Sequence, residues 1–145
     1  MKKIFLSSDH AGYKLKESIK LYLDKKKISY TDLGPFNSDR VDYPDYAHPL
    51  AKSVNDGVHQ LGILICGSAN GVNIAANKHQ QVRSALCWNV EVAQLARQHN
   101  NANVVAIPAR FISTELAMQI VDAFLSTEFE GGRHSNRVDK IAYEC

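Results

Sequence analysis

Residues 61–78 read Leu61-Gly-Ile-Leu-Ile-Cys-Gly-Ser-Ala-Asn-Gly-Val-Asn-Ile-Ala-Ala-Asn-Lys78. An apolar run of strand length ends at Cys66, a glycine-punctuated turn spans Gly67 to Gly71, and Val72 to Asn77 favours a helix. Such a turn directs several backbone N–H groups and a helix N-terminus at one point, which favours an anion. A thiol at the edge of that field loses its proton more readily than a free thiol. The stretch therefore predicts a strand–turn–helix unit that carries a reactive cysteine with a lowered pKa.

Strands and helices alternate along the rest of the chain. The apolar runs predict five strands, at Lys3–Ser8, Ile28–Leu33, Leu61–Cys66, Val82–Cys87 and Asn103–Ile107. Helical spacing of apolar residues predicts the intervening helices: one bearing Leu15, Ile19 and Leu23; one over Asp45–Val58; one capped by Asn89, with Val92, Leu95, Ala96 and His99 on one stripe; one from Ser113 or Thr114 to about Leu125; and a short terminal helix over Arg133–Tyr143. This alternation predicts an α/β fold, a three-layer α/β/α sandwich with a five-stranded parallel, Rossmann-like sheet.

Length and composition narrow the class of protein. The 145 residues fit one domain, residues 1–145, with 45% apolar and 22% charged residues. A net charge of +2 is too small to favour nucleic acid or an anionic membrane as the main partner. Three cysteines without framework spacing (Cys66, Cys87 and Cys145) indicate reduced thiols. With no visible signal peptide and no apolar stretch of spanning length, we expect a cytoplasmic protein.

Ligands of open parallel sheets bind at the carboxyl ends of the strands. The polar residues assigned to that edge are Asp9 and His10, Cys66 through Gly71, and Asn100 to Arg110. Asp9 and His10 can bind hydroxyls, move protons or face a phosphate, and equally fit a capped turn. Cys66 can be a buried small hydrophobe, as we expect for Cys87, but the glycine turn behind Cys66 favours a functional thiol.

Basic residues late in the chain indicate a phosphorylated ligand. Arg133 and Arg137 lie one helical turn apart, so both guanidinium groups can reach one dianion, although a solvated basic helix gives the same spacing. Arg110 and His134 are further candidates, whereas His99 and Asn100 alone fit an ordinary helix end. The glycine turn is neither a Walker motif nor a dinucleotide fingerprint, and the six histidines lack metal-ligand spacing. The pattern favours a small phosphorylated substrate over a nucleotide or polymer.

Taken together, the motifs resemble the ribose-5-phosphate isomerase B family, which also includes the subunits of galactose-6-phosphate and allose-6-phosphate isomerases. The resemblance covers essentially the whole chain. It is carried by Ser8-Asp-His-Ala-Gly12, Asp42-Tyr-Pro44, Ile63-Leu-Ile-Cys-Gly-Ser-Ala-Asn-Gly71, Ile74-Ala-Ala-Asn-Lys78, Ala96-Arg-Gln-His-Asn100 and Gly131-Gly-Arg-His-Ser-Asn-Arg-Val138.

The resemblance implies an aldose–ketose isomerase of the pentose phosphate pathway that works through an enediolate without metal or other cofactor. Cys66 matches the family's base, and the amides of Gly67, Ser68, Ala69, Asn70 and Gly71 match its anion hole. The remaining roles carry over as follows: Asp9, Ser68 and His99 to ring opening and hydroxyl binding; Tyr43 and Asn100 to sugar contacts; His10, Arg133 and Arg137 to the phosphate, with Arg110 and His134 as further contacts. Family members are homodimers or homotetramers, so sites shared between subunits are expected.

Two departures from the family pattern stand in the turn. Ser68 replaces the usual threonine and keeps its hydroxyl, and Ala69-Asn70 replaces a glycine-plus-apolar pair. Some members use an acidic residue beyond the turn as base, but Val72-Asn73 offers no carboxylate here, which favours Cys66.

Several functions remain open at this point. Ribose 5-phosphate and ribulose 5-phosphate are the leading substrate pair, and allose 6-phosphate or galactose 6-phosphate is the alternative, since pocket length is not readable from sequence. A non-catalytic sugar-phosphate binding module and a thiol-redox protein are the other classes. The set of Cys66, Asp9 and His99 disfavours the binding module, and the lack of a second cysteine near Cys66 in sequence disfavours redox chemistry.

Overall fold

The computed structural model describes residues 2–143, so Cys145 lies outside the described residues. Five strands within this range form one parallel sheet in the order β2-β1-β3-β5-β4. The strands are β1 (Ile4–Ser8), β2 (Thr31–Asp32), β3 (Leu61–Cys66), β4 (Ser84–Leu86) and β5 (Val104–Pro108). The helices are α1 (Tyr13–Lys25), α2 (Pro44–Asn55), α3 (Asn70–Ala76), α4 (Val90–Asn100), α5 (Thr114–Ser126) and α6 (Arg133–Asp139).

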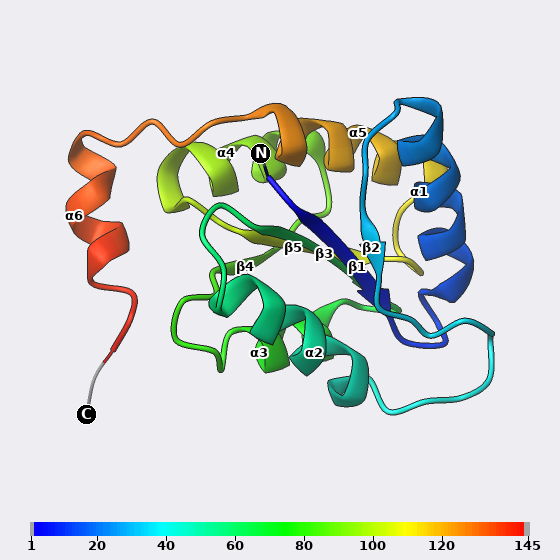
Figure 1. The fold of residues 1–145 in the computed structure, drawn as a ribbon. Helices are drawn as coiled ribbons and strands as arrows, with labels where there is room; N and C mark the ends of the chain where they lie inside the picture. Colours follow the sequence, from blue (N-terminus) through cyan, green and yellow to red (C-terminus); the bar gives the residue numbers. More distant parts are fainter. Residues whose placement is uncertain (1, 144–145) are drawn as a thin grey trace.

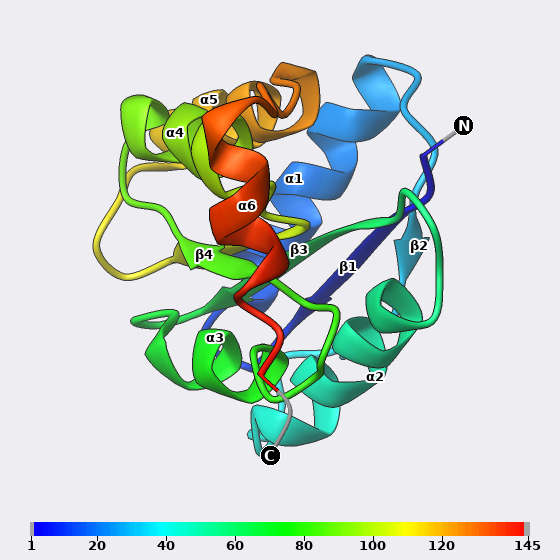
Figure 2. The same ribbon diagram turned by 90° about the vertical axis from the view of Figure 1, so that its left-hand side faces the viewer.

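Helices cover both faces of the sheet, which confirms the predicted three-layer α/β/α sandwich. Helices α1, α4 and α5 lie on one face, and α2 and α3 lie on the other (Figure 1). The central strand β3 is buried along its whole length, as its unbroken apolar run requires. Helix α6 stands apart from both layers and lies beside α4 and the β4 edge (Figure 2).

Strand register aligns the ends of the three central strands. Ser8 of β1 pairs with Ile65 of β3, and Cys66 pairs with Pro108 of β5. The segments that follow these strands therefore emerge together at the carboxyl edge of the sheet.

Several predicted elements differ from the observed ones: β4 (Ser84–Leu86) is shorter than the predicted Val82–Cys87, α2 ends at Asn55 before the predicted Val58, and three further differences have a structural reason or consequence. Strand β2 is only two residues long, because Ile28 N donates to Leu23 O at 2.9 Å and so belongs to the end of α1. Helix α6 ends at Asp139, short of the predicted Tyr143. In α4, Leu95 is exposed and the buried face is formed by Ala93, Ala96 and Arg97, so the predicted apolar stripe was partly wrong.

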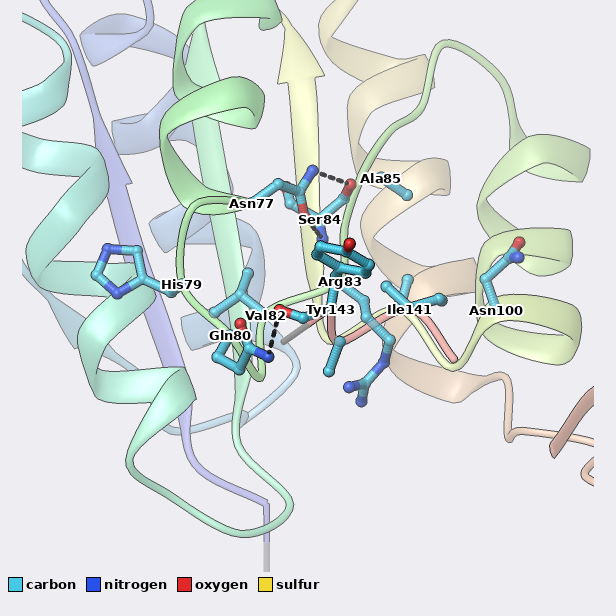
Figure 3. Close-up of a pocket in the computed structure, with 12 residues that line it drawn as sticks. Asn77, His79, Gln80, Val82, Arg83, Ser84, Ala85, Asn100, Ile141 and Tyr143 are labelled. Carbon is cyan, nitrogen blue, oxygen red and sulfur yellow. Dashed lines mark hydrogen bonds between the residues drawn. The ribbon is translucent and has the colours of Figure 1, made fainter. Parts of the chain in front are cut away.

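The edge strand β4 is covered by a side chain. Asn77 Nδ2 donates to Ser84 O at 2.9 Å, and Ser84 N donates to Asn77 Oδ1 at 2.8 Å (Figure 3). Because β4 pairs with β5 on its other side, the Asn77 amide occupies the outer edge at Ser84. Among residues 2–143, no helix has the length and apolar character needed to cross a bilayer.

Candidate active site

A cavity of about 330 Å³ opens at the carboxyl edge of the sheet. Its walls come from the ends of β1, β3 and β5 and from the residue before α2. The lining residues are Asp9, His10, Ala11, Tyr43, Cys66, Gly67, Ser68, Gly71, Arg110 and Phe111. Seven of the residue positions chosen from the motifs as site candidates, together with Cys66, thus meet in one place: Asp9, His10, Tyr43, Gly67, Ser68, Gly71 and Arg110.

Cys66 ends β3 with its thiol turned toward the following turn. Ala69 N donates to Cys66 Sγ at 3.1 Å, and the nearby backbone N–H groups of Ser68 and Val72 also act to lower the pKa of the thiol. The amides of the glycine turn therefore converge first on the thiol itself. This arrangement stabilises a thiolate relative to a thiol with no such donors.

Burial nevertheless raises the pKa of the Cys66 thiol, and the Asp9 carboxylate adds to the rise. The backbone donors from Val72, Ala69 and Ser68 lower the pKa, but they do not reverse the effect of burial. The expected lowered pKa of Cys66 is therefore wrong. The physical reason is that Cys66 is only 5% exposed. Burial destabilises the thiolate more than the N-terminus of the seven-residue helix α3 stabilises it.

The glycines of the turn permit close approach of side chains. A Cβ on Gly71 would lie 2.5 Å from Cζ of Tyr43, and a Cβ on Gly67 would lie 3.2 Å from Cδ of Arg110. The left-handed position of the turn falls instead on Ala69, with φ of 65°, where a non-glycine residue is strained. Ala69 is buried and offers its N–H to the sulfur, whereas Asn70 begins α3 with an exposed side chain outside the cavity lining.

Asp9 and His10 hold two loops at the cavity. Asp9 Oδ1 accepts from Gly12 N at 2.9 Å, so this carboxylate is both a turn cap and a cavity wall. His10 Nδ1 lies 3.2 Å from both the N and the O of Val41, so it can accept from the amide or donate to the carbonyl, depending on the tautomer. When Nδ1 accepts from the amide, the ring proton is on Nε2, which is then free to donate to an anion.

A second group of predicted site residues lies outside the Cys66 cavity. Five predicted residues within the described range are absent from the lining of the Cys66 cavity: His99, Asn100, Arg133, His134 and Arg137. Helix α4 runs back across the sheet, so His99 and Asn100 lie at its amino edge. Nearby, Asn103 O accepts from Gly62 N, close to the start of β3. The assignment of Asn100 through Asn103 to the carboxyl edge was wrong, because these residues precede β5.

Within the second group, His99 and His134 stack with ring centroids 4.3 Å apart and planes inclined by 14°. Arg133 and Arg137 are exposed on α6. Asn100 faces a separate cavity of about 450 Å³ beside β4, together with Arg83 and the segment from Ile141 to Tyr143 (Figure 3). The structure thus separates the base-and-turn group from the histidine-and-arginine group.

Two residues near these sites were not anticipated from sequence. Phe111 follows β5 and lines the Cys66 cavity. The Phe111 residue is 74% exposed. Glu130 contacts His134, with its Oε2 3.5 Å from Nε2. The sequence contains a signal for each position. Phe111 directly follows the candidate phosphate ligand Arg110, and Glu130 precedes the candidate His134 by four residues.

Comparison with known proteins agrees with the geometry. A family model described as Ribose/Galactose Isomerase matches residues 4–141. The chain belongs to the ribose/galactose isomerase family. Ribose-5-phosphate isomerase B of Escherichia coli is 45% identical over 141 residues, covering 97% of this chain and 95% of the relative. The Mycoplasma pneumoniae protein named probable ribose-5-phosphate isomerase B is 48% identical over 143 residues, covering 97% and 94%.

Solved structures of this isomerase family share the fold. The Thermotoga maritima ribose 5-phosphate isomerase has a TM-score of 0.93 at 48% identity and covers 97% of each chain. The Mycoplasma genitalium ribose-5-phosphate isomerase B, solved with bound ribulose-5-phosphate, has a TM-score of 0.94 at 46% identity, covering 97% of this chain and 94% of that one. Both the family and the α/β fold expected from the motifs are therefore confirmed.

Proposed function

We propose that this isomerase interconverts ribose 5-phosphate and ribulose 5-phosphate through an enediolate, with Cys66 as the base. The observation that carries the proposal is the Cys66 thiol, ringed by backbone donors, in a cavity that also holds Asp9 and Ser68. The Mycoplasma genitalium neighbour with bound ribulose-5-phosphate supports the choice of a pentose phosphate.

In the proposed reaction, the Cys66 thiolate removes the proton from C2 of the open-chain aldose. The C2–H electron pair forms the C1–C2 double bond, and the carbonyl oxygen at C1 takes the negative charge. The C2 hydroxyl then passes its proton to the C1 oxygen, the O–H electron pair forms the C2 carbonyl, and the C1–C2 double bond takes the proton back from the Cys66 thiol at C1. This yields the ketose and regenerates the thiolate. A proton next to a carbonyl is weakly acidic, so the step needs both a base and a stabilised oxyanion.

In this scheme, the turn amides stabilise first the thiolate of Cys66 and then the oxyanion of the enediolate. Before the transfer, Ala69 N donates to the sulfur, and the amides of Ser68 and Val72 also favour its charged form. When Cys66 takes the proton, its negative charge passes to the enediolate, and the field of the Gly67–Gly71 turn favours an oxyanion placed beside it. Donors of this kind contribute about 3 kcal/mol each to oxyanion stabilisation in other enzymes.

The remaining candidates bind and open the sugar in this proposal. Asp9, Ser68 and His99 open the ring and bind hydroxyls, while Tyr43 and Asn100 contact the sugar. His10, Arg110, Arg133, His134 and Arg137 bind the phosphate, and the turn residues Gly67, Ala69, Asn70 and Gly71 form the rest of the substrate cradle.

A complete site of this composition needs two copies of the chain. Cys66 lies at the carboxyl edge, while His99 stacks on His134 at the other group of candidates. We infer a homodimer or homotetramer in which one protomer supplies the Cys66 cavity and its partner supplies His99, Asn100 and the α6 arginines. Closed symmetric assembly is the usual form of soluble homo-oligomers.

A six-carbon phosphate is the second candidate, because the matching family model covers galactose as well as ribose isomerases. The same proton transfer applies to allose 6-phosphate or galactose 6-phosphate. Measuring ketose formation from each phosphate under identical conditions separates the candidates. A kcat/KM highest for ribose 5-phosphate supports the leading proposal, and one highest for a hexose phosphate replaces it.

The base is tested by substituting the thiol. Cys66→Ala should lower kcat on ribose 5-phosphate roughly a thousandfold, the scale of a lost general base, while sugar-phosphate binding persists. Cys87→Ala is the matched control, since Cys87 is also a buried free cysteine but lies outside the cavity lining. Wild-type turnover in Cys66→Ala would refute Cys66 as the base, and binding without turnover in the wild type would indicate a non-catalytic module.

A further inference from the structure

Three side chains with metal-binding atoms cluster where α4, α6 and the α5–α6 connection meet. His99 lies in the last turn of α4, His134 lies in α6, and Glu130 lies in the connection. One ligand atom from each lies within 4.8 Å of the others. The Cys66 cavity includes none of the three.

The backbone fixes the cluster. Glu130 N donates to Gln98 O at 3.1 Å, which holds the connection against the end of α4 beside His99. His134 N donates to Gly131 O at 3.0 Å, and the His134 side chain is buried with 6% exposure. Within residues 2–143, the Glu130 carboxylate is the one polar partner recorded for either imidazole, so the ring nitrogens have lone pairs to offer.

Two imidazole nitrogens and a carboxylate oxygen form a ligand set that suits zinc and its neighbours in the first transition row. Tetrahedral coordination with zinc–ligand distances near 2.1 Å places ligand atoms about 3.4 Å apart. The cluster approaches this spacing already, since Glu130 Oε2 and His134 Nε2 are 3.5 Å apart. Because the two imidazole planes are stacked and nearly parallel, the half-buried His99 ring must also turn out of the stack before both nitrogen lone pairs can point at one ion, while the exposed Glu130 side chain closes on it.

We propose that His99, Glu130 and His134 bind a divalent transition metal of the zinc class, and that the bound metal inhibits the isomerase. Binding follows from the ligand set alone. Inhibition rests on the proposed function, in which His99 helps to open the sugar ring. A metal on His99 occupies the nitrogen lone pair that this step requires.

The site is tested on the full-length protein in its native assembly, stripped of metal with a chelator that is then removed. Calorimetric titration with Zn²⁺ should show one ion bound per chain at this site, and Mg²⁺ should not compete, because it prefers oxygen ligands. Glu130→Gln keeps the shape of an exposed side chain but loses the charged ligand, so it should weaken Zn²⁺ binding at least about tenfold. Equal affinity of the wild type and Glu130→Gln would overturn the proposal.

Two other places on the molecule can bind zinc and need controls. His48 Nδ1 and His79 Nε2 lie 2.9 Å apart on the surface, so His79→Asn is the matched variant and should leave the Glu130-dependent binding unchanged. Cys66 is the other. Co²⁺ bound to imidazole and carboxylate gives visible bands without thiolate-to-cobalt charge transfer, and a charge-transfer band accompanying the Glu130-dependent binding would overturn the assignment.

Inhibition is measured separately with ribose 5-phosphate. Zn²⁺ should lower kcat/KM of the wild type at least about tenfold, chelator should restore it, and Glu130→Gln should need at least about ten times more Zn²⁺. Equal inhibition of both proteins would refute the inhibitory role. If the metal-free wild type fails to isomerise any sugar phosphate, the proposed function fails, and calorimetry still decides the metal site.

Discussion

Cys66 experiences two opposing influences. Burial and the Asp9 carboxylate favour the neutral thiol, whereas the amides of Ser68, Ala69 and Val72 favour the thiolate. Since burial prevails and the pKa of Cys66 is raised, only a small fraction of the free protein carries a thiolate at neutral pH. A thiolate with a raised pKa is also a stronger base, so the few ionised molecules abstract a proton more readily.

This balance predicts the pH dependence of the isomerase. Because the thiolate is the active form of the base and the pKa of Cys66 lies above its ordinary value of about 8.5, kcat/KM should rise steadily between about pH 7 and pH 9. The phosphate of the substrate loses its second proton near pH 6, below this window. Rates measured across the window should show the rise, and a profile that is flat from pH 7 to pH 9 would contradict a high-pKa thiol base.

Gly71 and Gly67 provide a matched pair of substitutions. Gly71→Ala would place a Cβ 2.5 Å from the Tyr43 ring and push that ring out of the cavity wall, so we expect KM for ribose 5-phosphate to rise more than kcat falls. Gly67→Ala meets the flexible Arg110 side chain at 3.2 Å and should change KM less. Steady-state kinetics of both variants provide the test, and a larger KM change in Gly67→Ala would contradict the proposed role of Tyr43.

The sequence predicts the composition of the Cys66 cavity well but not its electrostatics. Asp9 directly follows β1 and Cys66 ends β3, so the positions of the strand ends bring them together. The sign of the Cys66 pKa change depends on how deeply the fold buries the sulfur, which no local pattern records. The positive φ also falls on Ala69, between Gly67 and Gly71, and of these two glycines only Gly71 is held by a close contact, with the Tyr43 ring.

At the scale of elements, β2 depends on a buried ion pair. Lys16 of α1 is completely buried, and its Nζ lies 2.8 Å from Asp32 in β2, which Lys20 also contacts at 2.8 Å. Burial raises the pKa of Asp32, but the hydrogen bonds from Lys16 and Lys20 outweigh it and hold that pKa below its usual value. With two paired residues in its ladder, β2 has few other contacts with β1.

Asp32→Asn should therefore destabilise the protein by about 3 kcal/mol at pH 7, because it leaves the buried Lys16 ammonium without its main counterion. The folded pKa of Asp32 is lowered, so the ion pair contributes fully above the unfolded pKa of about 3.9 and is lost as pH falls through the folded value. Urea unfolding at several pH values measures both effects. A wild-type-to-variant difference that persists undiminished at pH 2 would contradict this account.

Helix and strand positions were easier to predict than their exposed faces. Asn89 and Ser113 cap α4 and α5 as their side chains suggested, with Asn89 Oδ1 accepting from Val92 N and Ser113 Oγ from Leu116 N. The exposure of Leu95 was not predictable from spacing. Helix α4 buries Arg97 against the backbone carbonyl of Thr127 instead, and that contact exists only after α5 is in place.

At the scale of the whole molecule, the candidates divide between the two edges of one sheet. Sequence order places Asn100 and Arg110 close together, but β5 runs between them and carries them to opposite edges. A shared site would reunite the groups across two copies. The family resemblance implied such sharing, and the fold indicates which residues would have to be shared.

Mixing two inactive variants tests this arrangement. Cys66→Ala and His99→Ala should each be inactive alone, but unfolding and refolding them together should restore activity. For a dimer, half of the molecules are mixed and one of their two sites is intact, so about a quarter of wild-type activity should return. If both residues acted within one chain, the mixture would stay as inactive as its components, which would refute the shared site.

The Asn77 amide on β4 bears on how copies of the chain can meet. An edge strand with free N–H and C=O groups is a template for another strand, and long uncovered edges lead to open-ended polymers. At Ser84 the amide of Asn77 takes the place of the missing neighbour, and β4 is only three residues long. Growth of the sheet from one molecule into the next is thereby discouraged at this edge. At this edge, association is left to side-chain surfaces, which can close on themselves and stop at a defined number of copies.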